Sequence, residues 1–330
     1  MNARPIFILG AHKSGTSLLR NIFDGHSLLF SVPIESHFFQ FMNDWIDNEY
    51  RQQRPNPDLG SSDLLQNFYN YIHKKNTSIN PYGESTAKDL FDENIFKKNF
   101  NLDCFNQANS KIFAKYIEAI YVSINQEKLP NKLRIVEKSV EHAEFAIELS
   151  QMYPKAKFIH ILRNPYSNLV SLRKFKSKNF GYPIIRRLLK TLYNNYYYLL
   201  KNKKVIEDYY IIRYEDLVSN PSKYLTEICG FLDIPFEEIL LTPTYQGEDW
   251  DGNSVEDKKF SRISDERLEN WKQKIHPMEI EYINHLFDFI LDSFEYKHFS
   301  ASGSFWKPAE GENIQRYFAN RLYKFYLQEW

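Results

Sequence analysis

Short runs rich in apolar residues recur along the chain, each followed by a polar or small-residue turn. Four of them have the length and residue types of buried strands, namely residues 6–9, 132–138, 157–162 and 208–213. Between them, apolar residues recur at helical spacing, as in proteins whose strands alternate with helices. The sequence therefore predicts a three-layer α/β protein with a central parallel sheet.

The longest interval between two predicted strands is filled by helical patterns. Residues 36–128 carry two apolar stripes at helical spacing, which predicts a helical insertion of about residues 36–130 within a single domain of residues 1–330. A last amphipathic pattern, residues 316–330, belongs to a predicted C-terminal helical extension of about residues 295–330. This helix could dock on its own core, on a second subunit or on a membrane surface, and its own core is favoured.

The composition is that of an ordinary globular protein. Of the 330 residues, 43% are hydrophobic and 25% charged, and Lys plus Arg equal Asp plus Glu at 42 each. Without net charge the chain has no global field for nucleic acid or an anionic membrane, so an anion site must be a local cluster. Cys104 and Cys229 match no metal-ligand spacing, and no apolar run could span a membrane. We therefore expect a cytoplasmic protein.

The first predicted strand runs directly into a small-residue loop and then a helix. Gly10 and Gly15 permit tight backbone turns, and residues 14–17 offer amides and hydroxyls to an anion at the helix N-terminus. The two glycines have the separation of a nucleotide-triphosphatase loop, but Thr16 occupies the lysine position and Lys13 comes three residues earlier. The loop is predicted to hold phosphate in a P-loop type of fold, although not as ATP enzymes do.

Two later strands end in cationic residues, at the edge where parallel sheets bind ligands. Lys138 ends the second predicted strand, and Arg163 directly follows the third. Asn164 and Pro165 then form a strong helix start, which places Ser171 about two turns into the helix. An arginine fork with a nearby hydroxyl suits a terminal phosphate.

Taken together, these motifs resemble those of a known family. The loop reads G-x-x-K-S-G-T-S-x-L, and the third strand is followed by R-N-P with a serine eight residues after the arginine. Over roughly residues 5–275 the chain resembles the sulfotransferases that use 3′-phosphoadenosine 5′-phosphosulfate (PAPS), closer to their tyrosylprotein and bacterial branch than to the cytosolic steroid-type branch. The resemblance implies that Lys13 contacts the 5′ phosphosulfate, that Arg163 and Ser171 hold the 3′-phosphate, and that Lys138 bridges donor and leaving group.

The resemblance also extends the expected donor site. A Y-E-D-L motif at residues 214–217 has a family counterpart, and a loop near residues 250–254 would lie over the nucleotide. The expected donor-binding set is completed by Ser14, Gly15, Thr16, Ser17, Tyr214 and Ser254. No metal is expected, because the sulfuryl group carries less charge than a phosphoryl group and its leaving group is already a phosphate.

Glu35 is the expected general base. In the tyrosylprotein branch a glutamate about twenty residues beyond the loop has this role, and Glu35 follows Lys13 by a similar interval. It could instead cap a helix that starts near Ser36. Glu84 and His142 are the reserve candidates.

The implied reaction is sulfuryl transfer from PAPS to a hydroxyl or amine. Glu35 would take the acceptor proton, while Lys13 and Lys138 would stabilise the departing 5′ phosphate. The sequence does not identify the acceptor, which could be a small molecule, carbohydrate, lipid or peptide. A P-loop kinase that uses ATP and magnesium and a non-catalytic nucleotide-binding module are the alternative functions.

Overall fold

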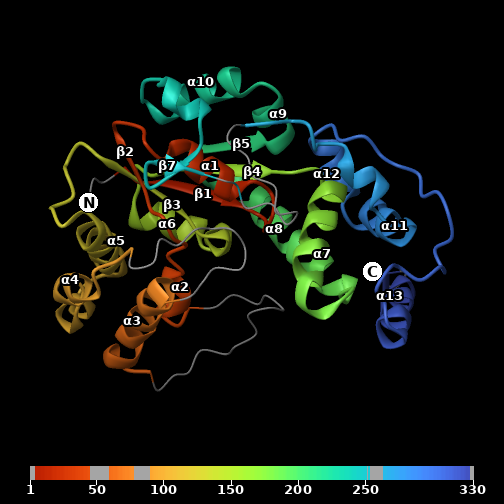
Figure 1. The fold of residues 1–330 in the computed structure, drawn as a ribbon, viewed down its shortest axis with the longest axis horizontal. Coiled ribbons are helices and arrows are strands. Elements are labelled where there is room, and N and C mark those ends of the chain that lie inside the picture. Colours follow the sequence, from red (N-terminus) through yellow and green to blue (C-terminus); the bar gives the residue numbers. More distant parts are fainter. Residues whose placement is uncertain (1–3, 45–58, 78–89, 251, 253–262, 328–330) are drawn as a thin grey trace.

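The computed structural model describes residues 4–44, 59–77, 90–250, 252 and 263–327. Its centre is a five-stranded, entirely parallel sheet with the order β2-β3-β1-β4-β5 (Figure 1). The strands are β1 (Ile6–Gly10), β2 (Leu29–Ser31), β3 (Arg134–Lys138), β4 (Lys157–Leu162) and β5 (Tyr209–Arg213). The predicted α/β fold is confirmed.

Helices separate the strands and extend beyond them. In the described residues they are α1 (Thr16–Phe23), α2 (Phe38–Phe41), α3 (Ser61–Thr77), α4 (Glu93–Asn99), α5 (Asn109–Asn125), α6 (Ala146–Met152), α7 (Pro165–Phe180), α8 (Ile185–Val205), α9 (Tyr214–Ser219), α10 (Pro221–Leu232), α11 (Pro277–Leu286), α12 (Asp288–Ser293) and α13 (Ile314–Leu327). A short antiparallel pair, β6 (Thr244–Tyr245) and β7 (Glu248–Asp249), follows α10. Among the described residues, the α-helices α2 to α5 lie between β2 and β3.

Alternate side chains of each strand point to opposite faces of the sheet, and helices bury both faces. On one face, Phe7 of β1 and Phe158 of β4 stack with ring centroids 5.3 Å apart and join a core with α3, α5 and α6. On the other face, Ile8 and Ile159 pack in a core that includes residues of α1 and α10. Apolar residues of α3 and α5 therefore form part of the hydrophobic core.

The strand order brings distant parts of the sequence to one edge. β1 pairs with β3 on one side and with β4 on the other, so the chain turns in opposite directions from the centre. Ligands of such sheets bind beyond the carboxyl ends of the strands at this reversal. Figure 1 shows α3 on one side of this edge and α7 on the other.

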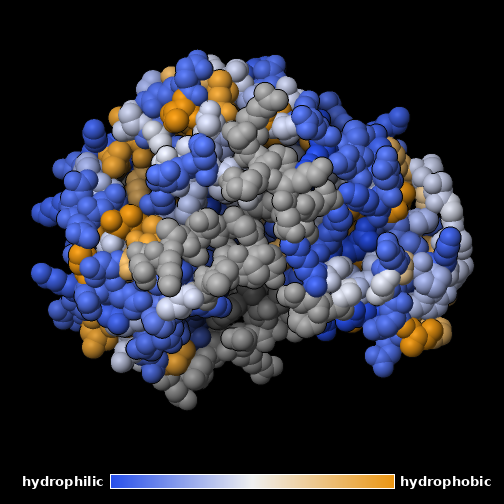
Figure 2. All heavy atoms as spheres, in the orientation of Figure 1, coloured by the Kyte–Doolittle hydropathy of each residue, from blue (hydrophilic) through white to orange (hydrophobic). Residues whose placement is uncertain are grey.

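The C-terminal helix α13 docks on its own core, as favoured from the sequence. The backbone N–H of Ile185 in α8 donates to Asn320 Oδ1 of α13 at 2.9 Å, and the buried Arg321 pairs with Glu312 at 2.6 Å. Four apolar side chains of α13 remain more than half exposed: Ile314, Phe318, Leu322 and Phe325. Figure 2 shows apolar surface where Figure 1 places α13. None of the described helices is long and apolar enough to cross a membrane.

Candidate active site

A cavity of about 880 Å³ lies at the reversal point of the sheet. Its walls come from the loop after β1, the ends of β3 and β4, the helices α3 and α7, and residues 263–274. Nine cationic side chains line its described part: Lys13, Lys74, Lys75, Lys138, Arg163, Lys174, Lys176, Arg267 and Lys274. Glu35 is the one carboxylate among the described lining residues. A chain without net charge thus concentrates positive charge in one place.

The loop after β1 opens the N-terminus of α1 toward the cavity. Gly15, Thr16 and Ser17 line the cavity, with Gly15 as N-cap of α1 at φ 109°. A Cβ at Gly15 would lie 2.5 Å from Tyr214 Cδ2, so both conformation and space demand glycine. Ser14 is buried, and its hydroxyl has no hydrogen-bond partner in the described structure. Ser14 is also absent from the cavity lining, unlike the other predicted loop residues.

Arg163 connects the loop to the β4 side of the cavity. Its Nη1 donates to the carbonyl of Lys13 at 2.9 Å, and its guanidinium lies 4.7 Å from the ring centre of Tyr214. Arg163 Nε is buried without an acceptor among the residues described. Asn164 caps α7 by accepting from the N–H of Tyr166 at 3.0 Å, so the helix starts as predicted.

Two further predicted donor-binding residues face the same space. Ser171 lines the cavity from α7, next to the end of β4. Lys13 also lines it, and its ammonium lies 4.4 Å from the ring centre of Phe175. The structure thus gathers Lys13, Arg163, Ser171 and Tyr214 from separate elements, whereas Ser254 lies outside the described residues.

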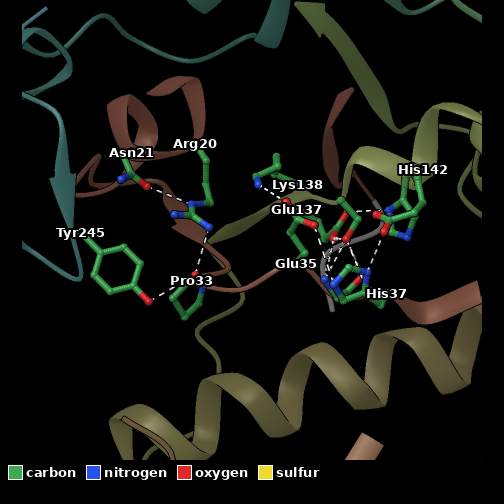
Figure 3. A network of polar contacts seen from close by, with 12 residues as sticks. Arg20, Asn21, Pro33, Glu35, His37, Glu137, Lys138, His142 and Tyr245 are labelled. Atoms are coloured by element: carbon green, nitrogen blue, oxygen red, sulfur yellow. Dashed lines mark hydrogen bonds and ion pairs between the residues drawn. The ribbon is translucent and has the colours of Figure 1, made fainter. Parts of the chain in front are cut away.

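Glu35 and Lys138 meet on the opposite wall. Lys138, at the end of β3, is almost fully buried and donates from Nζ to Glu35 Oε1. The second carboxylate oxygen of Glu35 lies 3.7 Å from His37 Nε2, and the three side chains point toward one another (Figure 3). The backbone carbonyl of Glu35 accepts from Tyr71 Oη of α3 at 2.8 Å.

The alternative role of Glu35 as a helix cap is wrong. The helix α2 begins at Phe38 with His37 as N-cap, and no side-chain hydrogen bond caps it. The N–H of Ser36 donates instead to Ser139 Oγ at 2.8 Å, which keeps this segment extended past Glu35. The Glu35 carboxylate is therefore directed at Lys138 and the cavity.

The structure also argues against His142, the reserve candidate for the base. Its side chain is fully buried, its Nδ1 lies 2.6 Å from Glu137 Oε2, and its ring packs edge-on against Phe39. Because it lies in the core and not in the cavity lining, it cannot reach an acceptor there. Glu84, the other reserve, lies outside the described residues.

Sequence reasoning missed the buried network that supports Glu35. Glu137 is fully buried and accepts from Ser139 Oγ at 2.6 Å and from the N–H of Ser36 at 3.2 Å. Burial alone would raise the pKa of Glu137, but His142 and these hydrogen bonds hold it below its ordinary value. The available signal was a carboxylate within a strand predicted to be buried, since a buried carboxylate needs partners.

A second missed residue holds the segment before Glu35. Arg20 of α1 is buried, donating from Nη1 to the carbonyl of Pro33 at 3.0 Å and from Nε to Asn21 Oδ1 at 2.9 Å (Figure 3). The Pro33 carbonyl also accepts from Tyr245 Oη at 3.3 Å. The backbone that leads to Glu35 is thus fixed from two sides.

Three comparisons relate this architecture to known proteins. The sulfotransferase domain of the Synechococcus PCC 7002 olefin synthase has a similar fold, with a TM-score of 0.55 and 21% identity over 90% of this chain and 96% of that domain. The sulfotransferase domain of the curacin biosynthetic pathway gives a TM-score of 0.52 and 21% identity over 89% of this chain and 98% of that domain. An uncharacterized protein of Aquifex aeolicus (strain VF5) is 22% identical over 72% of this chain. The matched part is 26% of that relative, so this chain spans about a quarter of its length.

The model of the sulfotransferase family matches residues 5–238. This match runs from β1 through the loop, Glu35, Lys138, Arg163 and Tyr214 to the end of α10, and so includes more than half of the chain and the cavity wall from both sides of the sheet. The chain therefore belongs to the sulfotransferase family.

Proposed function

We propose that the cavity binds PAPS and that the enzyme transfers its sulfuryl group to a hydroxyl or amine. The observation that carries this proposal is the contact between Arg163 and the loop at Lys13, on the wall opposite the Glu35–Lys138 pair. The chemistry of the lining fits such a donor, because Arg163 Nε is buried without a described acceptor and the lining is strongly cationic.

The donor-binding roles follow from position. Lys13 and the first amides of α1 would hold the 5′ phosphosulfate, since a helix N-terminus and an ammonium both favour anions. Arg163 and Ser171 would hold the 3′-phosphate, with Tyr214 beneath the guanidinium. Ser14 would support the loop from within the protein, because it does not line the cavity.

Glu35 and Lys138 would carry the chemical step. Glu35 accepts the proton of the acceptor hydroxyl while the acceptor oxygen bonds to sulfur and the bond from sulfur to the 5′-phosphate oxygen breaks. The electron pair of that bond stays on the phosphate, where Lys13, Lys138 and the α1 amides stabilise the new charge. The burial of Lys138 at the end of β3, its place in the cavity lining and its hydrogen bond to Glu35 support this role.

A kinase role is less well supported. In a kinase, Asp216 just after β5 would be the candidate magnesium ligand. Its Oδ2 lies 3.2 Å from Arg213 Nε in an ion pair, and Asp216 does not line the cavity. We further propose a cytoplasmic location, which suits the two buried, unpaired cysteines. The exposed side of α13 could contact a second subunit or a membrane surface, while the acceptor could be a small molecule, carbohydrate, lipid or peptide.

The donor assignment predicts a selective loss of affinity. Arg163→Ala should weaken binding of the product 3′-phosphoadenosine 5′-phosphate (PAP) by roughly 1.5 to 3 kcal/mol, yet leave binding of AMP nearly unchanged because AMP has no 3′-phosphate. Lys13→Ala should weaken the binding of both PAP and AMP. Isothermal titration calorimetry measures all four affinities, with the exposed Lys111 changed to alanine as control. Unchanged PAP affinity in both variants would remove the donor assignment.

A second prediction concerns metal. If PAPS is the donor, conversion of PAPS to PAP should continue in excess EDTA, because the cationic side chains supply the charge stabilisation. The measurement is PAP release by chromatography, with water or a tested alcohol as acceptor. Complete loss of turnover on chelation, restored by magnesium, would contradict this and favour ATP chemistry instead.

A further inference from the structure

One histidine of the cavity wall lies between two carboxylates. His37 Nδ1 is 3.0 Å from Glu141 Oε1, and His37 Nε2 is 3.7 Å from Glu35 Oε2. Resting on the proposed function, we propose that His37 and Glu141 are positioning residues that act through Glu35, with His37 as the next acceptor of the proton that Glu35 takes from the substrate.

The protein holds this imidazole in a defined place. The ring of Tyr71 meets it edge-on, with centroids 5.3 Å apart, and the backbone N–H of His37 donates to Ser139 Oγ at 3.3 Å. His37 also adopts a left-handed backbone conformation, with φ 47°, which is uncommon for residues other than glycine. A side chain held by these contacts is organised for a task, because a left-handed conformation has a cost that surrounding contacts must offset.

The proposed proton transfer runs from the acceptor through Glu35 to His37. The acceptor O–H bond breaks and its proton moves to Glu35 Oε2, the oxygen that Lys138 does not bind. The proton then passes to Nε2 of a neutral His37, whose Nδ1–H donates to Glu141. The resulting imidazolium lies between two carboxylates, and Glu35 regains its charge. Closing the 3.7 Å separation to hydrogen-bond length needs only a small rotation of either side chain.

The charges around His37 set its working pH. Burial alone would lower the pKa of His37, but Glu141 and Glu35 raise it above the ordinary value, against an opposing effect of Lys75 from α3. Lys138 adds positive charge through its bond to Glu35. The ring accepts a proton only when neutral, so the rate should fall as the pH drops through this raised pKa.

The test uses PAPS with water as acceptor and follows PAP release across pH. His37→Asn keeps a residue that tolerates the left-handed conformation, and should slow hydrolysis about 10- to 100-fold, as for other residues that support a reacting group. His37→Asn should also remove the fall in rate at low pH that is due to protonation of His37, the acidic limb of the pH–rate profile. PAP affinity should be unchanged. Glu141→Gln should shift that limb to lower pH, because the carboxylate that raises the histidine pKa is gone.

A surface pair provides the matched control. His73 Nδ1 lies 3.0 Å from Glu93 Oε1, the same separation as in the His37–Glu141 pair, and His73 is outside the cavity lining. His73→Asn should leave rate and pH profile as in wild type. If His37 has a purely structural role, His37→Asn would lower stability or rate, but Glu141→Gln would not shift the acidic limb of the pH–rate profile. That outcome overturns the proposal.

Failure of the proposed function gives a different result. A wild-type protein that neither binds PAP nor hydrolyses PAPS contradicts the sulfotransferase site itself. If PAP binds but hydrolysis is too slow to measure, NMR titration of the imidazole resonances, assigned with His37→Asn, replaces the rate. The pKa of His37 should then fall in both Glu141→Gln and Glu35→Gln, and a pKa unaffected by either change overturns the relay.

Discussion

Replacing Glu35 with glutamine is expected to slow the chemical step by ~10² to 10⁴, the usual contribution of a general base. PAP affinity should stay near that of wild type, because Glu35 belongs to the β2–β3 side of the cavity and Arg163, the proposed ligand of the 3′-phosphate, to the β4 side. The glutamine oxygen can still accept from Lys138, so the melting temperature should change little. Single-turnover rates, with calorimetry and thermal melts on the same preparation, measure all three quantities.

The control for this variant is a carboxylate that also pairs with lysine but lies on the surface. Glu118 Oε2 accepts from Lys115 Nζ at 3.0 Å on α5, far from the cavity lining. Glu118→Gln should leave the rate unchanged. A Glu35→Gln enzyme with wild-type single-turnover rate would show that Glu35 is not the base, and Glu84 would then be the next residue to change.

Replacing Glu137 with alanine is expected to lower the free energy of unfolding by about 3 to 5 kcal/mol, the range for breaking a buried ion pair. The change leaves His142 and the N–H of Ser36 buried with fewer partners, since Glu137 contacts both. Urea unfolding followed by circular dichroism measures the loss. Replacing Glu137 and His142 together with apolar residues should cost less than Glu137→Ala alone, which a double-mutant cycle detects.

The same prediction has a pH dependence with a definite sign. Because folding lowers the pKa of Glu137, its contribution to stability is complete above the unfolded carboxyl pKa and is lost as the pH falls through the folded value. The difference in unfolding free energy between wild type and Glu137→Ala should therefore shrink toward acid pH. A difference that stays constant from neutral to strongly acid pH would show that the Glu137 charge adds nothing.

Local signals were sufficient for four of the five strands, whereas β2 was not among the predicted strands. Residues such as Lys138 and Arg163 mark the ends of β3 and β4, and parallel strands bring such ends to one edge without further information. This is why Lys13, Lys138 and Arg163, up to 150 positions apart in the chain, line the same cavity. The cap of α7 at Asn164 was equally local, since it depends on the two residues after β4.

The environment of Glu35 depended on contacts that the sequence does not display. A Ser-His pair after Glu35 suggests a helix start, yet Ser36 is drawn into hydrogen bonds with Glu137 and Ser139, about 100 positions later. His142 was misplaced for a related reason, because the short 3₁₀ turn after β3 directs it to Glu137 in the core.

The division of the sheet at β1 has an evolutionary consequence. Arg163 and Tyr214 belong to the β4–β5 half, whereas Glu35 and Lys138 belong to the β2–β3 half, which also carries α2 to α5. Substitutions among those helices can alter what enters beside Glu35 without touching the contacts of Arg163 with the loop. Under the proposed function, the acceptors used can therefore diverge among related proteins while nucleotide binding is retained, and the segment between β2 and β3 is the natural unit to exchange in chimeras that alter acceptor choice.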